Sequence, residues 1–141
     1  MTKVIFIDHG NMFRSRVAEA LFNKFTKDDF RAGSYGTHVL EQGYQDLKIC
    51  EHKGTEPIIN ELKKYDIDIS NNRCKQLKEE FLEKDDKIVV MAEREYVPDW
   101  LNKFQYEHWE IPNPEYVDGK VAKEIVDLIK IKVLKLIDKI K

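Results

Sequence analysis

A short segment near the amino terminus, residues 8–15 (DHGNMFRS), combines residue types that suit an anion-binding loop. Gly10 permits a positive φ and Asn11 tolerates one, so successive backbone N–H groups can form a concave nest. Arg14 carries a planar guanidinium that can bind two oxygens of one phosphate. The segment lacks the lysine of a Walker loop and the spacing of G-x-G-x-x-G. We therefore expect a phosphate or sulfate to contact the loop residues His9, Gly10, Asn11, Met12, Phe13, Arg14 and Ser15.

A strand must lead into this loop and a helix must leave it. The apolar run over residues 3–7 (KVIFI) predicts a buried strand that ends at Asp8. A helix is expected to begin near Ser15, because apolar residues recur after it at helical spacing. Those residues are Val17, Leu21, Phe22 and Phe25. The positive end of that helix would add to the attraction of an anion.

The remaining periodicity predicts a small α/β domain. Further strands are expected over residues 30–35, 87–91 and 106–111. Helices are expected from residue 56, over 76–83 and from 119 onward, with a long surface loop over 36–54. This alternation favours an open four-stranded parallel sheet with helices on both faces, in one domain over residues 1–141. Ligands of such sheets bind at the carboxyl ends of the strands, so the loop after the first strand is the expected site.

The loop resembles that of the low-molecular-weight protein tyrosine phosphatases and the related arsenate reductases, which reads C-x-G-N-x-x-R-S and is followed by a Glu-Ala pair. The matching residues here are Gly10, Asn11, Arg14, Ser15, Glu19 and Ala20. The resemblance continues in the family's order through Ala32-Gly33-Ser34 and Ile67-Asp68-Ile69-Ser70 to Ile111-Pro112-Asn113-Pro114. It implies the family's fold, with a phosphate-binding loop between the first strand and first helix. It also implies a lineage that hydrolyses phosphate monoesters such as phosphotyrosine.

Two positions depart from the family pattern where its chemistry lies. Asp8 stands at the position of the nucleophilic cysteine, and Asn113 stands at the position of the general-acid aspartate. In the family mechanism a thiolate attacks phosphorus and the aspartic acid protonates the leaving group. A carboxylate is no thiolate, and an amide donates no acidic proton. The resemblance therefore assigns catalytic positions to Asp8, Arg14 and Asn113 and predicts an inactive chain.

Electrostatics argues against Asp8 as a replacement nucleophile. Two unit charges about 4 Å apart repel by roughly 4 kcal/mol at an effective dielectric constant of about 20, which is nearly three decades of affinity. Enzymes that form an aspartyl-phosphate generally use Mg²⁺ to offset this repulsion, and no second acidic residue stands beside Asp8 in the sequence. We expect no metal and no other cofactor. The carboxylate is instead expected to occupy the nest as a built-in anion.

Aromatic residues near the motif have weaker claims to a role. Tyr44 and Tyr116 could form walls for a phenyl ring, although ordinary packing or exposure explains each of them equally well. Cys50 and Cys74 match no zinc spacing and are expected to be passive thiols.

Composition limits the partners. The 24 basic and 26 acidic side chains give a formal net charge of −2, which provides no general attraction to nucleic acid or anionic lipid. No apolar run is long enough to span a membrane, and no secretion signal is evident, so we predict a cytoplasmic protein. Two functions remain open. One is an inactive or trapping form of a phosphotyrosine-type hydrolase, and the other is a natural pseudophosphatase that binds anions or phosphoproteins. The sequence does not indicate the oligomeric state.

Overall fold

The structure is a computed structural model that describes residues 3–26, 29–113 and 116–140. Its sheet is four-stranded, with the order β2-β1-β3-β4 and every neighbouring pair parallel. The strands are β1 (Val4–Asp8), β2 (Ala32–Gly36), β3 (Lys87–Val90) and β4 (Tyr106–His108). The expected four-stranded parallel sheet is confirmed; β1 is shifted by one residue from the predicted run, and β2, β3 and β4 are shorter than predicted.

The central strand β1 is buried at all five of its positions. It pairs with β2 on one side and with β3 on the other, so that Ile5 lies between Gly33 and Ile88. Burial on both faces explains why β1 is a continuous apolar run rather than an alternating one. The strand ends at Asp8, at the same edge of the sheet as the carboxyl ends of its neighbours.

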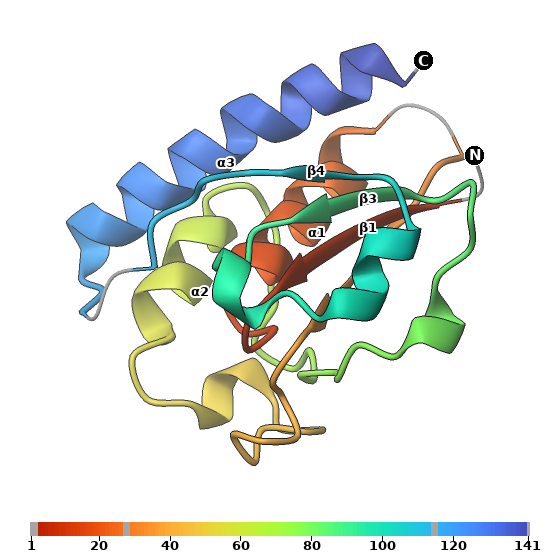
Figure 1. Cartoon of the computed structure of the whole chain (residues 1–141). Helices are drawn as coiled ribbons and strands as arrows, with labels where there is room; N and C mark the ends of the chain where they lie inside the picture. Colours follow the sequence, from red (N-terminus) through yellow and green to blue (C-terminus); the bar gives the residue numbers. More distant parts are fainter. Residues whose placement is uncertain (1–2, 27–28, 114–115, 141) are drawn as a thin grey trace.

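One face of the sheet is covered by α-helices. They are α1 (Arg14–Phe25), α2 (Glu56–Lys63) and α3 (Gly119–Lys139). Val4, Phe6 and Val89 of the sheet belong to the same buried cluster as the apolar side chains of these helices. Figure 1 shows α1 behind the strands, α3 above them along the side of β4, and α2 to the left. This layer contains most of the core.

The other face is covered by short 3-10 helices and loops. Ile5, Ile7, Ile88 and Val90 pack there against a second apolar cluster. That cluster includes Leu101 from η4 (Asp99–Lys103) and Leu77 and Leu82, which flank η2 (Glu79–Phe81). Helices therefore cover both faces, as expected, but one face has α-helices and the other has only short 3-10 helices and loops. The two remaining 3-10 helices are η1 (Ile49–Glu51) and η3 (Arg94–Tyr96).

Helix α1 begins at Arg14, within one residue of the expected start near Ser15. One local prediction needs correction. The helix predicted over residues 76–83 is wrong, because only η2 is helical there. The backbone at the start of this stretch pairs with β2 and does not form helical hydrogen bonds. Gln76 forms a parallel bridge to Gly36, and the Leu77 N–H donates to the Gly36 carbonyl. A tertiary contact with the sheet thus overrides the local helical pattern.

The long loop after β2 lies against the segment before η2. Backbone hydrogen bonds join Asp46 and Leu47 to Cys74, and Ile49 to Asn72. These bonds bring residues 72–76 beside the anion loop. No helix in the described part of the chain is long and apolar enough to cross a membrane.

Candidate functional site

The anion loop connects the carboxyl end of β1 to the first turn of α1. Asn11 adopts a left-handed conformation with φ of 57°, as the nest requires. Gly36 of β2 lies directly against the loop, and a Cβ atom there would meet the Asn11 nitrogen and the His9 oxygen, each at 2.8 Å. Glycine at position 36 therefore allows the second strand to approach the loop backbone.

The Asp8 carboxylate lies inside the loop and is 2% exposed. Its Oδ1 accepts the Asn11 N–H at 2.7 Å, and its Oδ2 accepts the Ser15 N–H at 2.9 Å. Ser15 is the second residue of α1, and no side chain at the N-cap position of this helix provides a hydrogen bond. Asp8 thus supplies from β1 both a loop anion and a helix cap, as expected of a built-in anion.

Other loop amides remain without an acceptor. In the described part of the chain, the N–H groups of Gly10, Met12 and Phe13 donate to no protein group. The carboxylate therefore uses only part of the donor capacity of the loop.

Arg14 is buried, being 3% exposed, and its guanidinium already has acceptors. Nη1 donates to the Met91 carbonyl at 2.6 Å and to the Ile111 carbonyl at 3.4 Å, and Nη2 donates to Glu93 Oε1 at 3.0 Å. Partial burial alone would raise the pKa of Glu93, but a hydrogen bond from its own backbone and the Arg14 guanidinium hold that pKa below its usual value. An anion in the loop would compete with these acceptors for Arg14.

Asn113 lies exposed after β4. It is two residues beyond Ile111, whose carbonyl accepts from Arg14, so the chain passes close to the loop just before Asn113. Pro114, which completes the Asn-Pro pair, lies outside the described residues. The structure records no contact from the Asn113 amide to the loop.

The two tyrosines proposed as walls differ in position. The Tyr44 ring lies beside Gly10, with Cδ2 3.8 Å from the place that a Cβ of residue 10 would occupy. Tyr116 is 75% exposed. Among the described residues, no contact brings Tyr116 to the loop.

Sequence reasoning missed an aromatic cluster beside the loop. The His9 ring stacks on His38, with centroids 4.9 Å apart, and also contacts Tyr96 of η3 at 4.3 Å. Burial, together with the neighbouring His38, lowers the pKa of His9 below its ordinary value. No sequence signal joins these residues, because they come from three separate segments.

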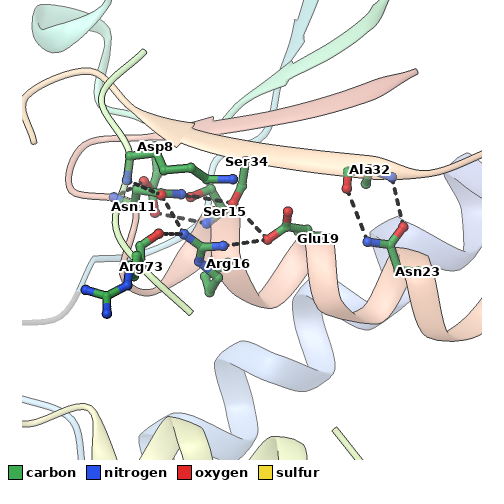
Figure 2. A network of polar contacts seen from close by, with 10 residues as sticks. Asp8, Asn11, Ser15, Arg16, Glu19, Asn23, Ala32, Ser34 and Arg73 are labelled. Carbon is green, nitrogen blue, oxygen red and sulfur yellow. Dashed lines mark hydrogen bonds and ion pairs between the residues drawn. The ribbon is translucent and has the colours of Figure 1, made fainter. Parts of the chain in front are cut away.

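A second group missed by sequence reasoning lies behind the loop. Figure 2 shows Arg16 joined to Asn11, Glu19 and the Arg73 backbone, with Ser15 and Ser34 close by. Asn11 Nδ2 also donates to Ser15 Oγ at 3.0 Å, so these two residues brace the loop.

The cysteines and acidic residues provide no alternative centre in the loop. Burial, with the nearby Asp8 charge, raises the pKa of Cys74 to about 11, which keeps its thiol protonated and weakly nucleophilic near neutral pH. Within the described residues, one acidic group is close enough to share a cation: Glu83, Asp85 and Asp86. It precedes β3 and thus lies at the amino end of the strands, away from the loop.

A family model matches nearly the whole chain and identifies its family. Residues 3–141 match the family model described as low molecular weight phosphotyrosine protein phosphatase. The chain belongs to this family. A comparison with curated proteins gives no significant match.

Solved structures of phosphatases and arsenate reductases share the fold. The low-molecular-weight phosphatase of T. tengcongensis is 25% identical, with a TM-score of 0.75 and coverage of 99% of both chains. Wzb of Vibrio vulnificus, solved in complex with benzylphosphonate, is 17% identical, with a TM-score of 0.81 and coverage of 98% of both chains. The arsenate reductase of Archaeoglobus fulgidus is 20% identical, with a TM-score of 0.70 over 96% of this chain and 98% of that one.

Proposed function

We propose that this low-molecular-weight phosphatase scaffold does not hydrolyse phosphate monoesters, because its own Asp8 carboxylate occupies the loop at the nucleophile position. The observation that carries the proposal is the pair of hydrogen bonds from the Asn11 and Ser15 N–H groups to Asp8. A second supporting observation is the amide at position 113, which cannot protonate a leaving group. In this proposal Asp8 and Asn113 hold the catalytic positions without performing the catalytic steps.

The ligand class in the proposal is a phosphate, a sulfate or a phosphotyrosine-bearing chain. Arg14 and the loop amides from His9 to Ser15 would bind the anion, and Tyr44 would contact an aromatic ring from the side. The benzylphosphonate complex of the Vibrio vulnificus relative supports this class. The proposal includes no metal and no cofactor. It keeps the cytoplasmic location expected from the sequence, in keeping with the free thiols of Cys50 and Cys74.

The second candidate function is a natural pseudophosphatase that acts as a binding module. The amides of Gly10, Met12 and Phe13 favour it, since they leave donors for an anion beside Asp8. The source gene separates the two candidates. A cysteine codon at position 8 would make this chain an inactive or trapping variant of an enzyme, and an aspartate codon would favour the binding module.

Turnover of a small aryl phosphate tests the proposal. We expect no release of phosphate by the parent chain above the buffer blank, because both nucleophile and acid are replaced. We expect Asp8→Cys to form a covalent phosphoenzyme, which mass spectrometry after acid quenching detects.

Two results would contradict this account. Steady phosphate release by the parent, abolished by Arg14→Ala, would show that the loop is catalytic as it stands. A phosphorylated parent chain would identify Asp8 as an aspartyl-phosphate nucleophile.

A further inference from the structure

Asn11 is the residue of the anion loop that adopts a positive φ. Asparagine tolerates the φ of 57° better than most residues with a side chain, and further contacts hold Asn11 there. Asn11 Nδ2 donates to Ser15 Oγ and to Ser34 Oγ, both at 3.0 Å. Asn11 Oδ1 accepts the Lys75 N–H at 2.8 Å. The side chain of Asn11 is therefore tied to α1, to β2 and to the segment before η2.

Arg16 completes this arrangement from behind the loop. Its side chain is nearly fully buried, and Nη2 donates to Asn11 Oδ1 at 2.7 Å and also to the Arg73 carbonyl. Nη1 donates to Glu19 Oε1 at 2.9 Å. Three separate segments thus share one guanidinium, and Figure 2 shows its central place among them.

The contacts form a closed circuit of four side chains. Asn11 donates to Ser34, and Ser34 Oγ donates to Glu19 Oε1 at 3.0 Å. Arg16 donates to the same Glu19 oxygen and also to Asn11 Oδ1, which closes the circuit. The planar fork of arginine provides several donors in fixed directions, whereas a lysine would provide one flexible ammonium. Among buried side-chain nitrogens and oxygens of the described residues, Arg16 Nε is one of two without a partner. The guanidinium is thus placed for Asn11 and Glu19 even though one of its own N–H groups is left unpaired.

We propose that Arg16 is a positioning residue for anion binding, which holds Asn11 in the left-handed turn and so keeps the loop N–H groups convergent. The inference rests on the proposed function in one respect, namely that the loop binds anions once Asp8 is removed. Arg16 itself does not contact the anion. It acts through Asn11 Oδ1, which would keep only the Lys75 N–H as a donor if the guanidinium were absent.

The test measures phosphate affinity and the Asn11 backbone together. Inorganic phosphate is titrated by calorimetry into the Asp8→Ala protein. The same titration is made with Asp8→Ala proteins that also carry Arg16→Met, Arg16→Gln or Val133→Ala. The three-bond HN–Hα coupling of Asn11 is measured by NMR in each protein, because this coupling reports φ. Val133 is a buried core residue of α3, so Val133→Ala controls for lost stability alone.

We expect Arg16→Met to weaken phosphate binding at least about tenfold and to change the Asn11 coupling. Arg16→Gln keeps one N–H donor that can reach Asn11 Oδ1, so it is expected to recover part of the affinity. Val133→Ala is expected to change neither quantity. Unchanged affinity and unchanged coupling in Arg16→Met would overturn the proposal, and so would an equal loss of affinity in Val133→Ala.

The experiment distinguishes failure of the proposed anion binding from failure of the role proposed for Arg16. If Asp8→Ala binds no phosphate at all, the anion-binding function is wrong. The Asn11 coupling, measured with Arg16→Met in the otherwise unchanged chain, then still decides whether Arg16 holds the loop. If Arg16→Met does not fold, the comparison of Arg16→Gln with the Asp8→Ala background decides in its place.

Discussion

Asp8 and Arg14 bring opposite charges to the anion loop, and each is already paired inside the chain. Asp8 accepts two loop N–H groups, and Arg14 donates to Glu93 and to two backbone carbonyls. A phosphate entering the loop therefore meets a carboxylate in its place and an arginine with other acceptors. Both effects oppose binding, and they can be removed separately.

Glu93 is the residue to change if the acceptors of Arg14 limit anion binding. In the Asp8→Ala background, Glu93→Gln removes a negative charge near the loop and weakens the competing bond to Arg14. Phosphate affinity is then expected to rise roughly tenfold, or about 1.4 kcal/mol. Calorimetry of the two proteins measures this difference. An unchanged or lower affinity would mean that Glu93 orients Arg14 for the anion rather than competing with it.

Asn113 can be tested as the missing acid. In a background with Asp8→Cys, we expect Asn113→Asp to raise the rate for phenyl-type leaving groups by about 10²- to 10⁴-fold, the range of a positioned general acid. The gain should shrink for leaving groups of low pKa, which need no protonation. A series of aryl phosphates measures the dependence. Equal gains for all leaving groups would assign residue 113 a role in loop shape.

At the residue scale, sequence reasoning found the loop but not its supports. Asn11 adopts the positive φ that the sequence suggested, whereas Gly10, at which a positive φ was also considered, does not. Arg16 and Glu93 were not predicted, because their roles depend on contacts with segments far away in the chain. His38 and Tyr96 were missed for the same reason.

At the scale of elements, the apolar runs predicted the strands because buried parallel strands need no alternation. The helix predicted over residues 76–83 failed where Gln76 and Leu77 bind the edge of β2 instead. The unequal cover of the two sheet faces was also beyond prediction. Short 3-10 helices such as η2 and η4 carry too few apolar residues to produce a periodic signal.

The edge strand β4 is fastened to its neighbours by Glu107. Lys87 Nζ of β3 donates to Glu107 Oε1 at 2.8 Å, Trp109 Nε1 donates to Oε2 at 3.0 Å, and Lys139 Nζ of α3 donates to Oε1 at 3.1 Å. The hydrogen bond from Lys87, with those from Trp109 and Lys139, lowers the pKa of Glu107 to about 2 in spite of partial burial. This carboxylate therefore links β3, β4 and α3.

The pH dependence of stability tests that link. A carboxylate whose pKa falls on folding stabilises the protein above its unfolded pKa, here about 4.5, and this stabilisation disappears as the pH falls toward 2. Glu107→Gln should therefore unfold more easily than the parent at pH 7, with the difference closing between about pH 4.5 and 2. Denaturant unfolding at several pH values measures it.

Glu79→Gln is a matched control, because the Glu79–Lys103 pair is exposed and should contribute little at any pH. A gap between Glu107→Gln and the parent that stays constant from pH 7 to pH 2 would contradict the role assigned to Glu107.

At the scale of the whole molecule, the fold is that of the family, while the proposal about chemistry depends on Asp8 and Asn113 alone. The family match covers residues 3–141, and the parallel sheet brings the carboxyl ends of its strands to one edge, where the loop lies. The net charge of −2 does not attract anions to the molecule as a whole, so any anion binding depends on local geometry. That geometry now favours the carboxylate already in the loop.

Phosphate titration of the parent and of Asp8→Ala tests this central claim most directly. If the Asp8 carboxylate holds the place of the anion, its removal should tighten phosphate binding by roughly two to three decades, following a repulsion of about 4 kcal/mol. Asp8→Ala should also be less stable than the parent without phosphate, since the Asn11 and Ser15 N–H groups lose their acceptor. Equal phosphate affinity in the two proteins would contradict the claim that Asp8 fills the loop.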